Sequence, residues 1–228
     1  MRVFASCVVI VLCAACGQAA APPSPPTSDA SPSPSPSPSP SPAEVNPARV
    51  ERVRSDLPDG YEVAGLSGRA APVALWGFGQ AWTADPIHCG ALADPAGDGA
   101  DEAVNGWSAS GPGGIVYAVV ADASVGLDPV LAASCGTWTL SAGHTSGVVT
   151  LVGPPAVDGA TTLGMATDAT TVVEGGTETH THADTFIAYL GEHVAYVAVV
   201  TDPGVAGPAL SADFASELLV KTVAAVRG

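Results

Sequence analysis

Six consecutive Ser-Pro pairs, from Ser31 to Pro42, constrain this chain of 228 residues more than any other feature. Proline fixes φ, lacks an amide donor and biases the residue before it toward extended backbone. We therefore expect residues 16–45 to form a disordered, Ser/Pro-rich spacer ahead of a folded domain, residues 46–228. At about 3.1 Å per residue, this spacer reaches up to about 90 Å. Besides a passive spacer, the composition is typical of glycosylated stalks and of PxxP ligands.

The first 15 residues predict an export signal. Arg2 is followed by an apolar run, Val3 to Leu12, which is too short to span a bilayer because a spanning helix takes roughly 20 apolar residues. The run ends in Leu12-Cys13-Ala14-Ala15-Cys16-Gly17, which resembles a bacterial lipoprotein processing site. The resemblance implies that residues 1–15 are a lipoprotein signal peptide and that Cys16 becomes the lipidated N-terminus. The protein would then be held on the extracytoplasmic face of the cell membrane by its lipid. The alternative is an ordinary secretory signal cleaved near Ala20, which would remove Cys16.

The charge balance excludes one class of partner. Seven Lys and Arg residues against 22 Asp and Glu give a formal net charge of −15, and Lys221 is the single lysine. Nucleic-acid binding needs basic side chains that neutralise phosphates, so no nucleic-acid partner is expected. By the same argument, anionic lipid headgroups are not expected partners. An acidic surface is instead suited to basic protein partners.

The cysteines predict one disulfide. Cys7 and Cys13 lie in the signal and Cys16 is assigned to lipidation, which leaves Cys89 and Cys135 in the domain. Two cysteines in an exported domain normally form a bridge, and closing a loop of this length stabilises the fold by roughly 4 kcal/mol. The alternative is a redox or metal-binding pair, but no CxxC spacing supports it.

Hydrophobic periodicity and turn residues predict the fold class. We expect an α+β domain with a mainly antiparallel sheet, short helices packed on one side and a disordered N-terminal leader. Asp85-Pro86 and Asp128-Pro129 each predict the start of a short helix, and an amphipathic helix is expected at each end of the domain, with Ser211 capping the second. Alternating segments between Gly-rich turns predict the strands. The expected helices cover 46–56 and 211–226, and the expected strands cover 61–66, 102–110, 114–121, 137–142, 147–152, 161–173, 177–190 and 193–201.

Three strings also resemble a known family. They are Arg52-Val53-Arg54-Ser55-Asp56-Leu57-Pro58-Asp59-Gly60-Tyr61-Glu62-Val63, Trp107-Ser108-Ala109-Ser110-Gly111-Pro112-Gly113-Gly114 and Val173-Glu174-Gly175-Gly176-Thr177-Glu178-Thr179. They resemble actinobacterial, mycobacterial-type lipoproteins that share a domain of unknown function, over about residues 46–228. More loosely, the plan is similar to the extracellular sensor domain of PknH-type receptor kinases. The resemblance implies an envelope location and ligand sensing or binding, and it transfers no catalytic residues.

One strand carries a row of metal-capable side chains. Strand alternation places Glu178, His180, His182 and Asp184 on one face. Same-face neighbours lie about 6 to 7 Å apart, so two of them are able to bind one Zn²⁺ together with ligands from a neighbouring strand. The alternative is a solvent-facing polar side of the sheet.

The segment Trp76-Gly77-Phe78-Gly79-Gln80-Ala81-Trp82 carries the second feature. Extended geometry would put Trp76, Phe78 and Trp82 on one side, where they are suited to stack on a sugar or an acyl chain. The alternative is that they fill the core, because the domain has few other large side chains.

These observations favour a lipid-anchored, non-catalytic, ligand-binding or sensor-like domain of the cell envelope that takes a lipid or carbohydrate and needs no cofactor. The alternative is a structural or protein-interaction lipoprotein without a small ligand. An envelope hydrolase is third, because a G-x-S-x-G elbow is absent: Gly106 to Gly111 is one residue too long and falls in an expected strand.

Overall fold

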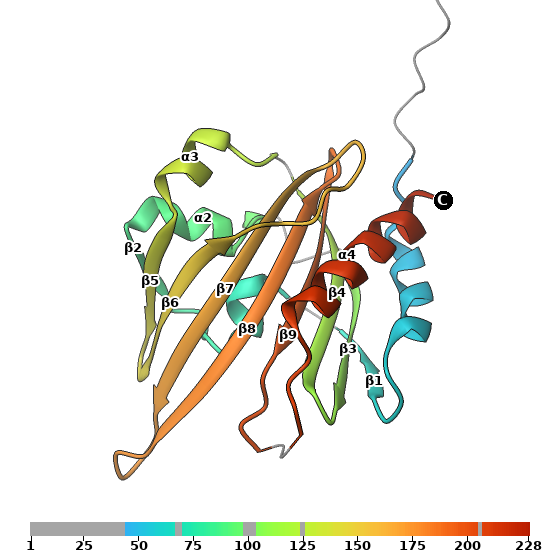
Figure 1. Cartoon of the computed structure of the whole chain (residues 1–228). Coiled ribbons are helices and arrows are strands. Elements are labelled where there is room, and N and C mark those ends of the chain that lie inside the picture. The colour runs from blue at the N-terminus through green and yellow to red at the C-terminus, as the bar shows by residue number, and fades with distance from the viewer. Residues whose placement is uncertain (1–43, 67–69, 98–103, 124–125, 205–206) are drawn as a thin grey trace, which may run out of the picture. The chain divides into compact units, whose positions relative to one another are not determined.

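A nine-stranded antiparallel sheet forms the body of the computed structural model, which describes residues 44–66, 70–97, 104–123, 126–204 and 207–228 (Figure 1). The predicted signal, Cys16 and the predicted spacer up to residue 43 lie outside the described residues. The strands follow the order β1-β3-β4-β9-β8-β7-β6-β5-β2 across the sheet. In chain order they are β1 (Glu62–Gly65), β2 (Thr83–Asp85), β3 (Asn105–Gly111), β4 (Gly114–Asp122), β5 (Thr137–Ala142), β6 (Thr145–Val152), β7 (Thr161–Val172), β8 (Glu178–Tyr189) and β9 (His193–Val200).

Short hairpins build most of this sheet, as the sequence predicts. The pairs β3–β4, β5–β6, β7–β8 and β8–β9 are each joined by a turn that contains glycine. Gly114 shows why one of these turns requires glycine: its φ is +114°, and a Cβ there would lie 2.4 Å from the carbonyl oxygen of Val200. The predicted fold class, α+β with a mainly antiparallel sheet, is confirmed.

Each face of the central strands is covered by its own apolar core. Ile187 and Tyr196 belong to one core, whereas Ala188 and Val197, their neighbours on the same strands, belong to the other. Burial on both faces explains the unbroken apolar run of β9, whose residues are buried from Val194 to Val200.

Helices therefore lie on both faces of the sheet, whereas the sequence predicted one. The 3₁₀-helix η1 (Pro47–Asp56) and the helix α4 (Ala212–Arg227) cover one face. The short elements α1 (Pro72–Leu75), η2 (Ile87–Cys89) and α2 (Gly90–Ala93) contribute to the core on the other face. The helix α3 (Pro129–Ser134) has no buried residue, but Cys135 at its C-terminal end joins that core. The physical reason is that strands buried on both sides need cover on both sides.

The two long helical elements begin where the sequence predicts. Ser211 caps α4, its side chain accepting a hydrogen bond from the amide of Phe214 at 3.2 Å. Leu218, Leu219 and Val223 are buried on the inner side of α4, whereas Val220 is exposed. In η1 the 3₁₀ geometry, with three residues per turn, brings Val50 and Val53 into line on the buried side.

Of the two predicted Asp-Pro helix starts, one is confirmed. Asp128 accepts a hydrogen bond from the amide of Val130 at 2.8 Å and caps α3. Asp85 instead ends β2, because its backbone pairs with Thr139 of β5, and the following helical turn begins only at Ile87. In the part of the chain that the structure describes, no helix has the length and apolar character needed to cross a bilayer.

Candidate functional site

The segment from Trp76 to Trp82 does not adopt the extended geometry on which a common aromatic face depends. Trp76 ends the α1 turn, and Gly77 then adopts a φ of +91°, which redirects the chain. Trp76 and Phe78 are each only 2% exposed, and the indole nitrogen of Trp76 donates a 2.9 Å hydrogen bond to Oγ1 of Thr185. These two aromatics belong to the core, and the segment presents no common aromatic face.

Trp82 is different because it lines a shallow pocket of about 380 Å³ at the β2 edge of the sheet. Its indole packs against Gly90, where a Cβ would lie 3.0 Å from the ring. Gly90 has ordinary helical backbone angles, so glycine serves here to make room for the indole rather than to allow an unusual φ. Apolar groups dominate the remaining lining, formed by Ala84, Ile87 and Ala91, with Thr83, Asp94 and Gly97 at the periphery.

Ile87 is the most exposed large apolar residue of the described chain, with 84% of its surface in contact with solvent. It lies on η2, one residue before His88 and two before Cys89. Val130 on α3 is the second most exposed, at 75%. An isolated exposed apolar residue is common, but Ile87 lines a pocket together with the apolar side chains of Trp82, Ala84 and Ala91.

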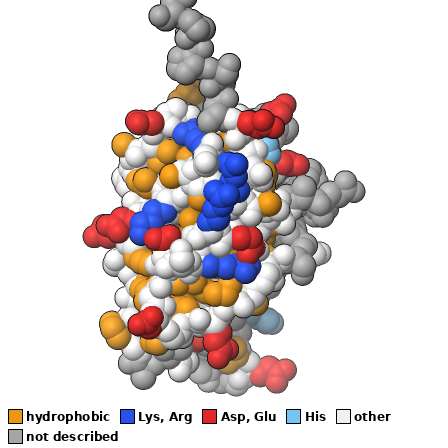
Figure 2. Space-filling view, turned by 90° about the vertical axis from the view of Figure 1, so that its right-hand side faces the viewer, with side chains coloured by type: hydrophobic (Ala, Val, Ile, Leu, Met, Phe, Trp, Pro, Cys, Tyr) orange, Lys and Arg blue, Asp and Glu red, His pale blue; other side chains and the backbone are white. Residues whose placement is uncertain are grey.

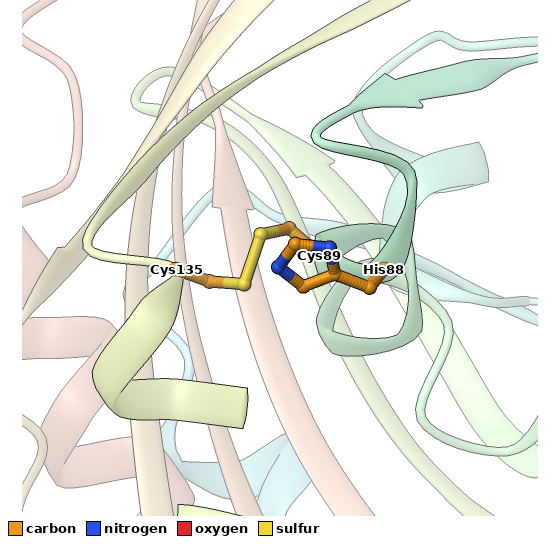
Figure 3. A group of neighbouring side chains, drawn as sticks. All are labelled: His88, Cys89 and Cys135. Carbon is orange, nitrogen blue, oxygen red and sulfur yellow. A yellow bond between two sulfur atoms is a disulfide. The ribbon is translucent and has the colours of Figure 1, made fainter. Parts of the chain in front are cut away.

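The predicted disulfide between Cys89 and Cys135 is present, and it ties η2 to the C-terminal end of α3. Figure 3 shows the imidazole of His88 beside this bridge. His88, Cys89 and Cys135 are the one group of three metal-capable side chains close enough to share an ion in the described residues. Both sulfurs are used in the disulfide, so neither is available as a thiolate ligand.

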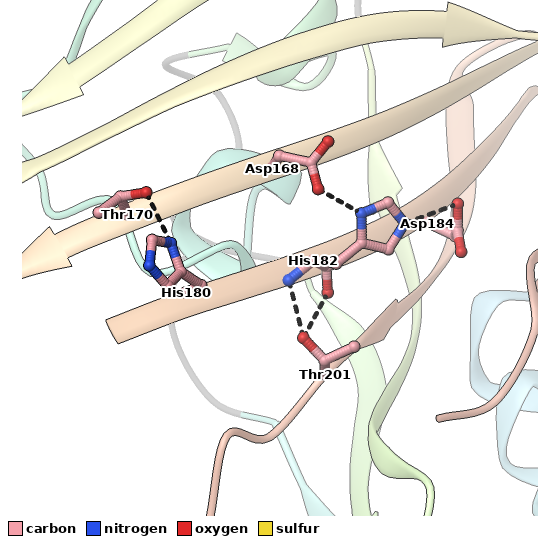
Figure 4. A network of polar contacts seen from close by, with 6 residues as sticks. All are labelled: Asp168, Thr170, His180, His182, Asp184 and Thr201. Carbon is pink, nitrogen blue, oxygen red and sulfur yellow. Dashed lines mark hydrogen bonds and ion pairs between the residues drawn. The ribbon is translucent and has the colours of Figure 1, made fainter. Parts of the chain in front are cut away.

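The polar row on β8 lies on one face, as the strand alternation predicts, but its members pair instead of converging (Figure 4). His182 Nδ1 lies 2.7 Å from Asp168 Oδ1 on β7, and His182 Nε2 lies 3.4 Å from Asp184 Oδ1. His180 Nδ1 lies 3.1 Å from Thr170 Oγ1, and His180 Nε2 lies 3.8 Å from Glu178 Oε2. The row therefore divides into two separate pairs of contacts.

The surrounding carboxylates hold a proton on His182. Its pKa rises from 6.5 to about 9, chiefly because it donates a hydrogen bond to Asp184; partial burial opposes this rise and Asp168 adds to it. At neutral pH both ring nitrogens are therefore protonated, whereas a metal ligand needs a free lone pair. This geometry does not favour a metal ion at Glu178, His180, His182 and Asp184.

The Thr170, His180 and Glu178 side chains have the order of a hydroxyl, imidazole and carboxylate triad. The imidazole-to-carboxylate distance of 3.8 Å is too long for a hydrogen bond, and the side chains of His180 and Glu178 are 70% and 58% exposed. Such an open arrangement lacks the water-excluding surroundings that make a nucleophile effective. It does not favour the hydrolase hypothesis.

Three residues of these candidate sites were not identified from the sequence: Asp168 and Thr201 beside His182, and Ile87 at the pocket. Asp168 and Thr201 flank His182, with Thr201 Oγ1 accepting from the His182 amide at 2.7 Å. Pairing β7 with β8 about the predicted Gly175-Gly176 turn would have placed Asp168 opposite His182. Ile87 carries no comparable signal, because a single isoleucine in a predicted helix is normally buried.

The described domain is thus a disulfide-bridged α+β domain on an open antiparallel sheet, with an apolar pocket at one edge. The chain belongs to the family described as domain of unknown function (DUF5642), which matches residues 46–227. Membership of an uncharacterised-domain family, predicted from three strings, is confirmed. Among curated proteins, none matches the chain.

The solved structures that are similar to this chain include two from mycobacteria. One is the X-ray structure of an uncharacterised protein, the Rv0999 ortholog, from Mycobacterium smegmatis, with 19% identity and a TM-score of 0.61, covering 81% of this chain and 98% of that chain. The other is the extracellular domain of PknH from Mycobacterium tuberculosis, with 15% identity and a TM-score of 0.41, covering 81% of this chain and 92% of that chain. At these identities the first likeness shows a shared fold and no more.

Proposed function

We propose that this protein is a lipid-anchored, extracytoplasmic domain that binds a small ligand and has no catalytic activity. The pocket at Trp82 and Ile87 carries the proposal, because it combines an accessible indole with an exposed aliphatic side chain. Ligand sites are concave and mostly apolar, with few polar groups. The disulfide supports an extracytoplasmic location, because such bonds persist in oxidising compartments.

The lining favours an aliphatic chain over a free sugar. Trp82, Ala84, Ile87 and Ala91 offer apolar contact, whereas Thr83 and Asp94 are the polar or charged side chains of the described lining. Sugar binding uses several side-chain hydrogen bonds in addition to an aromatic surface. The proposed ligand is therefore an amphiphile whose alkyl part enters the pocket and whose polar part stays in water.

Native mass spectrometry of the full mature chain, purified from its own host, tests both parts of the proposal. An added mass that corresponds to covalently attached lipid, on the peptide that begins at Cys16, would establish the anchor. A dissociable lipid adduct on the folded chain would establish the ligand. If neither the Cys16 peptide nor the folded chain carried any mass beyond that of the polypeptide, the structural or protein-interaction alternative would be favoured.

Titration with octyl glucoside below its micelle concentration then locates the site, with Trp fluorescence as the readout. Glucose alone is expected to have no effect. Ile87→Ser is expected to weaken binding about fivefold to tenfold, because it removes aliphatic surface that the alkyl chain would cover. Val220→Ser is the matched control: it makes the same kind of change at an exposed apolar residue of α4, away from the pocket. Equal effects of both substitutions would refute the assignment of the site.

A further inference from the structure

Three metal-capable side chains meet where the disulfide joins η2 to α3. They are His88, Cys89 and Cys135, and the ligand atoms that they offer all lie within 4.8 Å of one another. Cys89 and Cys135 are fully buried, whereas His88 is exposed and its imidazole lies beside the bridge (Figure 3). In the bridged protein this group is a covalent link with a histidine next to it.

The fold makes no polar use of the His88 imidazole. Among the described residues, no hydrogen bond or ion pair engages this ring. By contrast, His180, His182 and His193 each lie beside a carboxylate oxygen. A neutral imidazole has one nitrogen with a free lone pair, which is the form that binds a metal ion. His88 is therefore available as a ligand.

The spacing of the three side chains fits zinc once the bridge is open. Tetrahedral Zn²⁺, with Zn–S bonds of about 2.3 Å and Zn–N bonds of about 2.0 to 2.1 Å, places neighbouring ligand atoms roughly 3.4 to 3.8 Å apart. The Cα atoms of Cys89 and Cys135 lie 5.6 Å apart, so rotation of the two side chains is enough to separate the sulfurs to this spacing. The backbone of η2 and α3 need not move.

The charge of such a site suits its position. Two thiolates balance the charge of Zn²⁺ and a neutral imidazole adds none, so no uncompensated charge is buried. Every described Lys and Arg lies on η1 or α4, where Figure 2 shows them among acidic side chains. No described basic side chain on η2 or α3 therefore opposes the entry of a cation.

We propose that the dithiol form of this protein binds Zn²⁺ through Cys89, Cys135 and His88, with the fourth position open to water on the exposed His88 side. Zinc takes the place of one proton on each sulfur, and no atom changes its oxidation state. The dithiol form exists before the bridge is made. A small dithiol reductant also regenerates it: each cysteine sulfur gains one electron and one proton, and the reductant becomes its own disulfide.

Zinc would then hold η2 to α3 in place of the covalent bond, and the bridged form would have no site. The inference concerns the cysteines and His88 alone, so it does not depend on ligand binding at the Trp82 pocket.

Cobalt titration tests the site, because Co²⁺ accepts the same ligands and its bonds to thiolate give a charge-transfer absorption band. The test uses residues 16–228 with Cys16→Ser, so that Cys89 and Cys135 are the only cysteines. The reduced chain is expected to develop the band until one ion is bound per chain, and Zn²⁺ is expected to displace the cobalt. The bridged chain is expected to show no band.

A matched pair of histidine variants separates a built site from chance binding by two thiols. His88→Ala is expected to weaken cobalt binding to the reduced chain more than about tenfold. His144→Ala removes an exposed histidine in the turn between β5 and β6 and is expected to leave the affinity unchanged. Equal effects of the two substitutions, or a folded reduced chain without the band, would overturn the inference.

Circular dichroism of the same samples covers the case in which reduction unfolds the metal-free chain. Zinc is then expected to restore the folded spectrum of the unaltered chain, because metal binding and folding are coupled. The same zinc concentration is expected to leave His88→Ala unfolded. Failure of zinc to restore the unaltered chain, or equal recovery of both chains, would overturn the inference as well.

Discussion

His182 shows how a single side chain couples the stability of this fold to pH. Its folded-state pKa of about 9 lies above the unfolded value of 6.5 because Asp184 and Asp168 both favour the imidazolium. The stabilisation is fully present below pH 6.5, where both states are protonated, and it declines as the pH rises from 6.5 through about 9. Since 41% of the His182 side chain is exposed, solvent screening reduces the contribution to about 1 kcal/mol.

Replacing Asp184 with Asn is the corresponding prediction. The variant is expected to lose about 1 kcal/mol of unfolding free energy at pH 6 and much less at pH 10, because the charge on His182 is gone there in both proteins. Denaturant titrations at the two pH values measure the difference. Asp168→Asn, at a side chain that is 79% exposed, is expected to have a smaller effect. A His182 proton resonance that titrates near 6.5 in the unaltered protein would refute this account.

The buried hydrogen bond from Trp76 to Thr185 carries a second residue-scale prediction. Thr185→Val leaves the Trp76 indole N–H buried without its acceptor, which is expected to cost about 1 to 3 kcal/mol. A double-mutant cycle with Trp76→Phe is expected to give a coupling energy on the order of 1 kcal/mol. A coupling near zero, measured by denaturant unfolding, would show that the bond contributes nothing.

The same residues show where sequence reasoning stopped. The alternation of aromatics and small residues from Trp76 to Trp82 satisfies a strand pattern, but the positive φ of Gly77 and the α1 turn redirect the segment. Nothing in the neighbouring sequence indicates that Gly77 adopts a positive φ. Burial of Trp76 then depends on Thr185, which is 109 residues away. Only Trp82 of the predicted aromatic face therefore remains accessible.

At the scale of elements, long strands and long helices could be predicted and short ones could not. The strands β7, β8 and β9 could be predicted because each has a long run of alternating or apolar residues between glycine-containing turns. The four-residue helices α1 and α2 are too short for periodicity or propensity to decide. Their conformation comes from packing on the sheet, which is tertiary information. For the same reason, the one-sided placement of helices was wrong.

The disulfide provides an element-scale prediction. Changing both Cys89 and Cys135 to Ala is expected to cost about 2 to 5 kcal/mol in unfolding free energy, because the loop of 46 residues is no longer closed in the unfolded chain. The variant is also expected to weaken octyl glucoside binding, since η2 carries both Cys89 and the pocket residue Ile87. Calorimetry and fluorescence titration measure the two effects. Full binding in the variant would show that the pocket does not depend on the bridge.

The cap of α4 is a simpler element-scale case. Ser211→Ala removes the acceptor of the Phe214 amide and is expected to cost about 1 kcal/mol. Ser134→Ala, at an exposed hydroxyl near the end of α3 that bonds the Leu131 carbonyl oxygen, serves as a control with a smaller expected loss. Thermal unfolding distinguishes the two, and equal losses would contradict the capping role.

At the scale of the whole molecule, composition alone concealed how charge is distributed. A net charge of −15 argued against any anionic partner, yet the described cations all lie on η1 and α4. An average over the chain carries no information on which elements pack together. The sheet order places the Trp82 pocket at the β2 edge, whereas η1 packs on β3 and β4 and α4 packs on the central strands β8 and β9.

Mapping the backbone amide shifts of the domain by NMR, during titration with octyl glucoside below its micelle concentration, tests the central claim most directly. The account predicts saturable shifts confined to β2, η2 and α2 around Trp82 and Ile87, and no such shifts with glucose alone. Shifts that do not saturate, or that gather on another part of the sheet, would contradict a ligand site at this pocket.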